Sequence, residues 1–145
     1  MKIRIATSGD VADMFRIRIG VHENKMTMAE LAEYGITPES LPAMLSGDGQ
    51  GWVAEQDGKV VAFAMADAGD ATIFALFVDP PFEGQGIGRG LMAAAEQWLR
   101  GRGCTQAWLE TDSDSNVRAN GFYRHLGWLA SNKQEDGQTK FIKHL

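Results

Sequence analysis

The stretch PPFEGQGIGRGLMAAAEQWL, residues 80–99, decides how this chain is organised, because it joins a glycine-rich loop to a strongly helical segment. Glycine occupies four alternate positions in it, Gly84, Gly86, Gly88 and Gly90. A glycine destabilises a helix or a strand by roughly 0.5–1 kcal/mol relative to alanine, so this cluster indicates a requirement of the backbone. We therefore expect something to lie close to this main chain.

A strand that enters a helix through glycines leaves backbone N–H groups unpaired at the start of the helix. The helix dipole adds roughly half a positive charge there, which makes the position an anion site, most naturally for phosphate. Two common nucleotide motifs do not fit. The dinucleotide pattern G-x-G-x-x-G has Arg89 or Leu91 where its last glycine belongs, and the triphosphate loop needs a lysine, which is absent between Lys59 and Lys133.

The remaining hydrophobic patterns predict strands and helices in alternation. Strands are expected over residues 2–6, 52–55, 59–66, 71–78, 106–111, 128–132 and 139–143. Helices are expected from about 10 to 19, from 28 to 35, after Thr37-Pro38, from 87 to about 101 and from 116 to 126. Residues 71–78, ATIFALFV, indicate a central strand covered on both faces. Two strand–helix–strand passages predict parallel pairing and the hairpins antiparallel pairing, so the fold class is α/β with a mixed sheet.

Composition narrows the class of protein. A chain of 145 residues is expected to form a single domain, 1–145. Its 14 basic and 19 acidic residues leave no basic stripe for nucleic acid, and one cysteine with three scattered histidines leaves no spacing for a metal site. No apolar run long enough for a membrane span and no export signal is present, so we expect a cytoplasmic location.

Two motifs resemble a known family. Residues 85–90, QGIGRG, are similar to the Gln/Arg-x-x-Gly-x-Gly/Ala signature of the GNAT N-acetyltransferase superfamily, and LFVDP at 76–80 is similar to the strand end before it. Residues 116–128, NVRANGFYRHLGW, resemble Asn-x-x-Ala-x-x-x-Tyr-x-x-x-Gly-Phe, with Trp128 replacing the usual phenylalanine. The resemblance implies a GNAT-like fold: a central, mostly antiparallel sheet flanked by helices, with a splayed pair of parallel strands.

The resemblance also implies a donor and its site. Acetyl-CoA, or another acyl-CoA, would be the co-substrate, and no metal is implied. Main-chain N–H groups would hold its pyrophosphate at Gln85, Gly86, Ile87, Gly88, Arg89 and Gly90. The backbone near Phe77 and Val78 would pair with the pantetheine arm, and one of those N–H groups would polarise the thioester carbonyl.

Two further residues receive roles from the second motif. Tyr123 would protonate the departing thiolate, although its spacing from Phe122 and Leu126 is equally that of a packed helix face. Asn116 would lie near the pantetheine or the acceptor, although an asparagine there serves equally as a helix N-cap.

The general base is unassigned, because the glutamate that many family members carry in the central strand is missing from ATIFALFV. Asp70 precedes this strand and Asp79 follows it, and the remaining acidic candidates are Glu23, Glu110 and Asp112. The resemblance suggests an acceptor site lined by Arg16, Arg18, His22, Glu23, Asn24, Met26, Met28 and Tyr34. Arg16 and Arg18 lie on different helix faces, so at most one of them is expected to serve a site.

The function expected from these residues is transfer of an acetyl group from acetyl-CoA to a primary amine. Cys104 lies far in sequence from both motifs, which argues for direct transfer without an acyl-cysteine. A small-molecule amine is the first expectation for the acceptor. Two alternatives stay open: a non-catalytic acyl-CoA-binding or sensing module, and an acetyltransferase acting on protein N-termini, lysines or a charged transfer RNA. The family also allows a homodimer, which these residues do not test.

Overall fold

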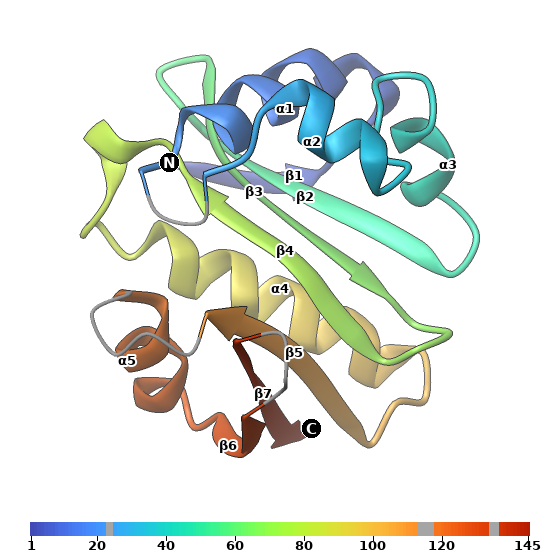
Figure 1. Ribbon diagram of the computed structural model, residues 1–145, viewed down its shortest axis with the longest axis vertical. Helices are drawn as coiled ribbons and strands as arrows, with labels where there is room; N and C mark the ends of the chain where they lie inside the picture. Colours follow the sequence, from blue (N-terminus) through green and yellow to red (C-terminus); the bar gives the residue numbers. More distant parts are fainter. Residues whose placement is uncertain (23–24, 113–117, 134–136) are drawn as a thin grey trace.

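Seven strands form one mixed sheet in the computed structural model, which describes residues 1–22, 25–112, 118–133 and 137–145. Within those ranges the strand order is β1-β2-β3-β4-β5-β7-β6 (Figure 1). The strands are β1 (Lys2–Ile5), β2 (Gly49–Gln56), β3 (Lys59–Asp67), β4 (Thr72–Val78), β5 (Gln106–Asp112), β6 (Leu129–Lys133) and β7 (Gln138–His144). Neighbouring strands pair antiparallel except β4 and β5, so the predicted mixed, mostly antiparallel sheet is confirmed.

Helices cover both faces of this sheet. The helical segments are η1 (Ser8–Asp10), α1 (Val11–Gly20), α2 (Met28–Glu33), α3 (Leu41–Met44), η2 (Pro80–Phe82), α4 (Ile87–Gly101) and α5 (Arg118–His125), where η marks a 3-10 turn. The first three α-helices pack against the face that carries Val53, Phe63 and Met65. The last two pack against the face that carries Trp52 and Ala62, because successive strand residues point to opposite sides. In the described ranges no helix is long and apolar enough to cross a membrane.

The parallel pair of strands separates soon after it forms. β4 and β5 are in register only at Thr72 and Trp108, where the Thr72 hydroxyl donates to the Trp108 carbonyl oxygen at 2.9 Å. The expectation that β4 is covered on both faces is therefore wrong for most of its length. Phe74 is 45% exposed and residues 75–78 are partly exposed, because the gap between the strands opens toward the C-terminal end of β4.

The second strand–helix–strand passage does not produce the predicted parallel neighbours. β7 lies between β5 and β6 and pairs antiparallel with both. It is in register with β5 from Gln106 opposite His144 to Asp112 opposite Gln138. The C-terminal strand β7 therefore lies beside β5, where the strand–helix–strand pattern predicts β6. The predicted hairpin between the last two strands is confirmed as a strand pair, although its turn lies partly outside the described residues.

The start of α2 follows its predicted cap, whereas α3 begins later than predicted. Thr27 accepts a hydrogen bond from the Glu30 N–H at 3.1 Å and donates its own N–H to the Glu30 carboxylate at 3.1 Å, which confirms the capping box before α2. The short helix after Thr37-Pro38 begins later than predicted. Thr37 and Ser40 exchange side-chain hydrogen bonds at 2.9 and 3.0 Å, which closes a turn first, and α3 starts only at Leu41.

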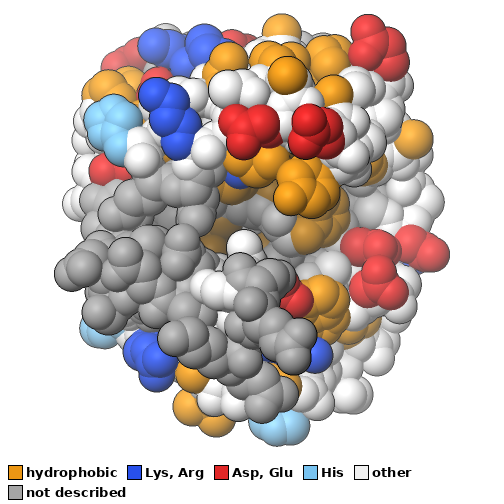
Figure 2. All heavy atoms as spheres, viewed as in Figure 1, with side chains coloured by type: hydrophobic (Ala, Val, Ile, Leu, Met, Phe, Trp, Pro, Cys, Tyr) orange, Lys and Arg blue, Asp and Glu red, His pale blue; other side chains and the backbone are white. Residues whose placement is uncertain are grey.

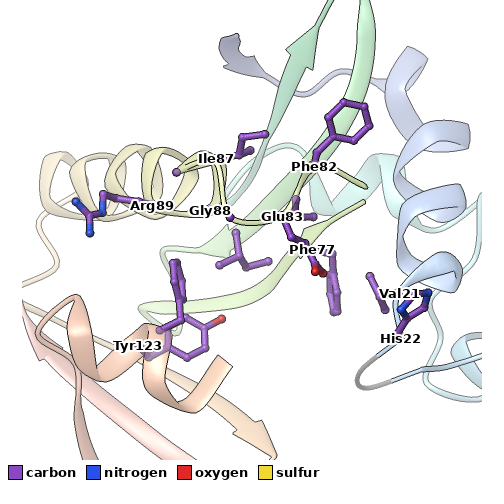
Figure 3. Close-up of a pocket in the computed structure, with 14 residues that line it drawn as sticks. Val21, His22, Phe77, Phe82, Glu83, Ile87, Gly88, Arg89 and Tyr123 are labelled. Atoms are coloured by element: carbon purple, nitrogen blue, oxygen red, sulfur yellow. The ribbon is translucent and has the colours of Figure 1, made fainter. Parts of the chain in front are cut away.

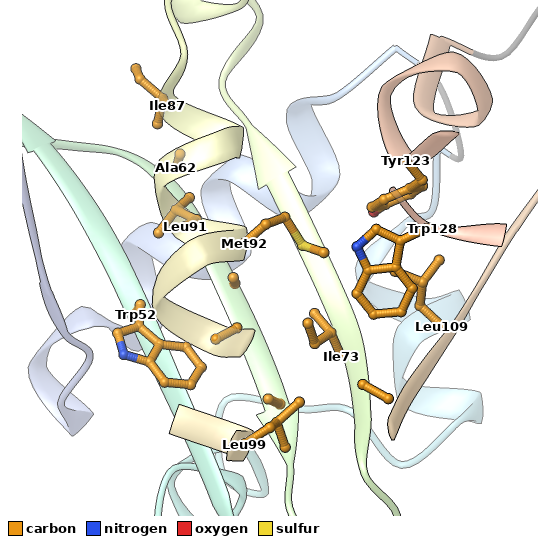
Figure 4. Close-up of a cluster of buried hydrophobic side chains, with 14 of the residues drawn as sticks. Trp52, Ala62, Ile73, Ile87, Leu91, Met92, Leu99, Leu109, Tyr123 and Trp128 are labelled. Atoms are coloured by element: carbon orange, nitrogen blue, oxygen red, sulfur yellow. The ribbon is translucent and has the colours of Figure 1, made fainter. Parts of the chain in front are cut away.

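The main core lies between α4 and the sheet (Figure 4). Ile87, Leu91, Ala95 and Leu99 are all buried, as their helical spacing predicts. They pack on side chains of the sheet that include Trp52. The glycine-rich loop is thereby fixed to a helix that cannot move without disrupting the core.

A buried acid in α4 is a feature that the sequence patterns did not reveal. Glu96 forms an ion pair with the Lys143 ammonium at 2.8 Å and accepts a hydrogen bond from the Trp128 indole N–H at 3.3 Å. Lys143 also donates to the Leu126 carbonyl oxygen at 2.9 Å. These contacts tie α4 to β7 and to the end of α5, next to Tyr123.

A second ion pair joins β1 to the first helical turn, and it gives a stability prediction. The Arg4 guanidinium donates to both carboxylate oxygens of Asp10, at 2.8 and 2.9 Å, and the Thr7 N–H donates to the same carboxylate at 2.8 Å. The hydrogen bonds from Arg4 hold the pKa of Asp10 below its ordinary value of 3.8. This contribution to stability is present above pH 3.8 and is lost as the pH falls through the lower folded-state pKa.

We expect Asp10→Asn to lower the free energy of unfolding by about 1–3 kcal/mol at pH 7, because it removes the carboxylate that accepts two hydrogen bonds from Arg4 and leaves Arg4 paired with Glu55 alone, at 2.6 Å. The loss should shrink below the ordinary pKa of Asp10, where the carboxyl is protonated in the unfolded chain. Urea unfolding of both proteins at pH 7 and at acid pH measures this. Equal midpoints at pH 7 would contradict it.

Candidate active site

A cleft of about 640 Å³ opens where the C-terminal half of β4, the start of α4 and α5 meet (Figure 3). Seven of the residues predicted from the motifs line it: Phe77, Val78, Gly86, Ile87, Gly88, Arg89 and Tyr123. Gln85 and Gly90 do not line it, and Asn116 lies outside the described residues. The fold thus brings the two motifs together at one cleft although they are far apart in the chain.

Other lining residues were not predicted for the donor site. They are Val21, His22, Leu76, Phe82, Glu83, Gly84 and Phe122. Val21 and His22 follow α1, and His22 was expected at the acceptor site instead. Phe82 and Glu83 directly precede the glycines. A prediction that the whole loop between residues 79 and 87 lines the site would have included them.

The start of α4 presents unpaired backbone donors to the cleft. Gly86 is the N-cap residue and has a φ of 80°, a left-handed conformation that glycine adopts without strain; Gly84, with a φ of 77°, turns the chain before it. In the described part of the chain, the N–H groups of Ile87, Gly88 and Arg89 have no hydrogen-bond acceptor. These three donors and the dipole of a 15-residue helix form the kind of site that binds phosphate.

The other two glycines of the loop allow close packing. A Cβ on Gly88 would lie 3.3 Å from Cζ of Phe122, and a Cβ on Gly90 would lie 2.6 Å from Cδ1 of Ile3. The Gly90 N–H already donates to the Gly86 carbonyl oxygen at 3.2 Å, so it is not a free donor. The alternating glycines therefore have two separate causes, a turn for the first two and helix packing for the last two.

We expect Gly90→Ala to be tolerated. Its only close neighbour is the end of a flexible Ile3 side chain, and alanine favours the helix by about 1 kcal/mol. The melting temperature should change little, and the affinity for acetyl-CoA should stay within about threefold, because this change corresponds to less than about 1 kcal/mol. A loss of affinity above about tenfold, measured by calorimetry, would show instead that Gly90 contacts the ligand.

Among the residues that the structure describes, no strand pairs beyond Thr72 with the edge of β4 that is turned away from β3. The Asp79 N–H donates to the Val61 carbonyl oxygen of β3 at 2.8 Å, which fixes the direction of the peptide groups before it. Because these directions alternate along a strand, Phe77 turns its N–H toward β3, whereas Leu76 and Val78 turn theirs away from β3. The backbone of Leu76 and Val78 is thus available to a ligand that extends along β4.

Tyr123 is buried at the wall of the cleft. Its ring packs against Phe122, Phe141 and Trp128, with centroids 5.3, 5.9 and 6.5 Å away. Figure 3 shows its hydroxyl oxygen turned toward the middle of the cleft. Burial raises the pKa of this phenol above its ordinary value of 10.0, so the hydroxyl stays protonated at every physiological pH. Packing and a polar role, which the sequence left as alternatives, are both compatible with this position.

A second pocket of about 400 Å³ lies beside the first, and Phe77 lines both. Three of the expected acceptor residues line it, namely Arg18, Met26 and Tyr34, together with Glu110 from β5. Burial lowers the pKa of Arg18, whose guanidinium lies 4.3 Å from the Phe77 ring centroid. The pocket is otherwise lined almost entirely by apolar side chains.

The expected choice between the two arginines of α1 is resolved by their contacts. Arg16 pairs with Asp13 at 3.2 Å and with Asp79 at 3.4 Å, and it donates to the Val60 carbonyl oxygen at 2.7 Å. It therefore holds α1 against β3 and the residue after β4, whereas Arg18 lines the second pocket. Of the other candidates, Glu23 and Asn24 and the side chain of Asp112 lie outside the described residues.

No metal site is found among the residues that the structure describes, where no three His, Cys, Asp or Glu side chains stand close enough to hold an ion. The donors that the cleft does offer are backbone N–H groups, which suit an anion.

Comparison with known proteins identifies the class that this fold and cleft define. The profile of the Acetyltransferase (GNAT) family matches residues 18–128, which is most of the chain and includes both motifs. The chain therefore belongs to the GNAT acetyltransferase family, as the two motifs predicted.

Relatives by sequence include two kinds of N-acetyltransferase. The chain is 39% identical over 75 residues to the ribosomal protein bS18-alanine N-acetyltransferase of Escherichia coli, and this match spans about half the length of each protein. It is 31% identical over 140 residues to an uncharacterised N-acetyltransferase of Archaeoglobus fulgidus, covering 85% of this chain and 89% of that one.

Solved structures share the fold over the full length. The paia N-acetyltransferase of Thermoplasma acidophilum, solved in complex with coenzyme A, superposes with a TM-score of 0.83 at 16% identity and covers 100% of both chains. At that identity the likeness bears on the fold alone, and it agrees with the splayed sheet seen here.

Proposed function

We propose that this protein is an N-acetyltransferase that moves an acetyl group from acetyl-CoA to a primary amine by direct transfer. The observation that carries the proposal is the meeting of three features at one cleft: the free N–H groups at the start of α4, the unpaired edge of β4 and the buried hydroxyl of Tyr123. Each suits a different part of a long, anionic thioester. We place this activity in a single domain, 1–145, acting in the cytoplasm.

The residues present fit the donor from its phosphates to its thioester. Ile87, Gly88 and Arg89 would donate their N–H groups to the pyrophosphate, next to the turn at Gly86. The exposed Gln85 stands just before this turn. Leu76 and Val78 would exchange hydrogen bonds with the amides of the pantetheine arm, as a neighbouring strand does.

The chemistry supplied by the donor is an activated carbonyl carbon bound to a good leaving group. The Leu76 or Val78 N–H would stabilise the negative charge that develops on the carbonyl oxygen as the amine forms its new C–N bond. Tyr123 would give its hydroxyl proton to the sulfur as the C–S bond breaks. Burial raises the pKa of Tyr123, so the hydroxyl carries the proton that this step needs.

The acceptor amine would reach the thioester from the second pocket, because Phe77 separates the two spaces. The exposed carboxylate of Glu110 is an acidic group in its lining and would attract an ammonium ion and take up its proton through water. A small-molecule amine is our first candidate. A protein amine is the second, and the relationship to bS18-alanine N-acetyltransferases favours it.

Release of free thiol from acetyl-CoA tests the proposal, with a panel of small amines and a panel of peptides as acceptors. We expect thiol release that depends on the amine, with one acetyl group found on the product by mass spectrometry. Binding of acetyl-CoA without turnover on either panel would favour a sensing module. Turnover on peptides alone would assign the activity to a protein acceptor.

A further inference from the structure

We infer that the acceptor carries a bulky apolar group on the carbon next to its primary amine. This inference rests on the proposed function and concerns the second pocket, whose chemistry differs from that of the donor cleft. The donor cleft presents backbone donors, whereas the second pocket presents side chains of methionine, phenylalanine, leucine and isoleucine.

The lining of the second pocket includes both buried and exposed apolar side chains. Met14, Phe15 and Leu31 line it and are buried, and all three belong to the core beneath the first helices. Phe74 and Tyr34 also line it and are 45% and 75% exposed. An apolar surface therefore runs outward to solvent, where exposed aromatic side chains would otherwise be unfavourable.

Seen as in Figure 1, the molecule is hollowed near its centre, and hydrophobic side chains gather at the rim of the hollow (Figure 2). An aqueous pocket with such walls gains most from a ligand that removes its apolar surface from water.

The second pocket is too large to be filled by an acceptor that has only a methyl group beside its amine. A cavity of about 150 Å³ is enough for a benzene ring, and this pocket measures about 400 Å³. An acceptor with only a methyl beside its amine would leave most of the walls in contact with water. The methionines Met14, Met26, Met44 and Met65 are adaptable in shape, so branched and aromatic groups should both be accommodated.

Two charged side chains line the second pocket, Arg18 and Glu110. Phe77 forms the wall shared with the donor cleft, and the Arg18 guanidinium lies 4.3 Å from its ring centroid. The Glu110 carboxylate is the group of this lining that would attract the ammonium ion, while an apolar group beside the amine is held among the methionines. The pocket therefore selects amine and side chain together.

A series of amino acid amides tests the inference, because the amides differ only in the group beside the amine. We expect kcat/KM to be at least about 30-fold higher for leucinamide, methioninamide and phenylalaninamide than for alaninamide, since one methylene in an apolar pocket gives about tenfold or more. A kcat/KM for alaninamide equal to or above the others would overturn the inference. Binding of acetyl-CoA with turnover of neither amides nor peptides would instead refute the proposed function.

A pocket-filling variant provides a second test. Ala75→Leu adds volume to the wall on β4 and should lower the ratio of kcat/KM for phenylalaninamide over alaninamide by about tenfold. The matched control is Ala93→Leu on the exposed side of α4, which should leave this ratio unchanged. Melting temperature and acetyl-CoA affinity show whether each variant folds. An unchanged ratio in a folded Ala75→Leu protein would overturn the inference. If this variant does not fold, the amide series on the wild-type protein still tests the inference.

The same assay distinguishes a protein N-terminus from a free small amine as the acceptor. It also distinguishes failure of the proposed function from failure of the apolar preference. Peptides that begin with leucine or phenylalanine should match the amides if the acceptor is a protein N-terminus, and only the small amides should react if it is a free amine. Absence of acetyl-CoA binding would refute the proposed function itself. Binding with turnover but no apolar preference would refute the pocket's role alone.

Discussion

Replacing Tyr123 by phenylalanine should lower kcat by roughly 10²–10⁴-fold, the range typical of a lost general acid, while the Kd for acetyl-CoA stays unchanged. The substitution removes one oxygen atom and keeps the ring that packs on Phe122, Phe141 and Trp128. Without the hydroxyl, the sulfur must leave as an unprotonated thiolate in an apolar setting. Because burial raises the pKa of Tyr123, the wild-type rate should not fall near pH 10 through ionisation of this residue.

Single-turnover rates and calorimetric titration of the same samples separate chemistry from binding. The melting temperature serves as the control for packing and should move little, because the ring is retained. A Tyr123→Phe protein with wild-type kcat would remove the proton-donor role and leave Tyr123 as a core residue.

Gly86→Val should weaken acetyl-CoA binding by roughly 10- to 100-fold, the equivalent of about 1–3 kcal/mol of backbone strain. Gly86 has a φ of 80°, which a β-branched residue adopts only at such a cost. Its new side chain would meet open space, so the effect comes from the backbone and not from a clash. Relief of the strain would rotate the first N–H groups of α4 away from the pyrophosphate.

Gly101→Val is the matched control for this change. Gly101 is the last residue of the same helix, its Cβ would also meet nothing within 4 Å, and it lies outside the cleft. The control should bind acetyl-CoA as the wild type does. Equal affinity in Gly86→Val would mean that the turn does not form the phosphate site.

Sequence patterns predicted those parts of the fold that depend on near neighbours in the chain. The spacing of Ile87, Leu91, Ala95 and Leu99 predicted the buried face of α4, and the capping box at Thr27 predicted the start of α2. The two motifs predicted the family and half of the residues that line the donor cleft, because the residues of each motif are consecutive and lie on a strand end, a loop or a helix.

Features that depend on distant parts of the chain were not predictable. The close neighbour of Gly90 is Ile3, which lies on β1 at the other end of the sequence. β4 is exposed because it separates from β5. The place beside β5 that the pattern predicts for β6 is taken by β7. The second pocket joins side chains from α1, from β4 and from Glu110 of β5, and its apolar residues look like ordinary core in the sequence.

The central claim is that the start of α4 and the edge of β4 bind an acyl-CoA. Calorimetric titration of the purified protein with acetyl-CoA, with CoA and with ATP tests it most directly. We predict saturable binding of one molecule of acetyl-CoA or CoA per chain and no saturable binding of ATP, which has the phosphates but lacks the pantetheine arm. Absence of binding by both CoA species would contradict the account and leave the glycine-rich turn without a ligand.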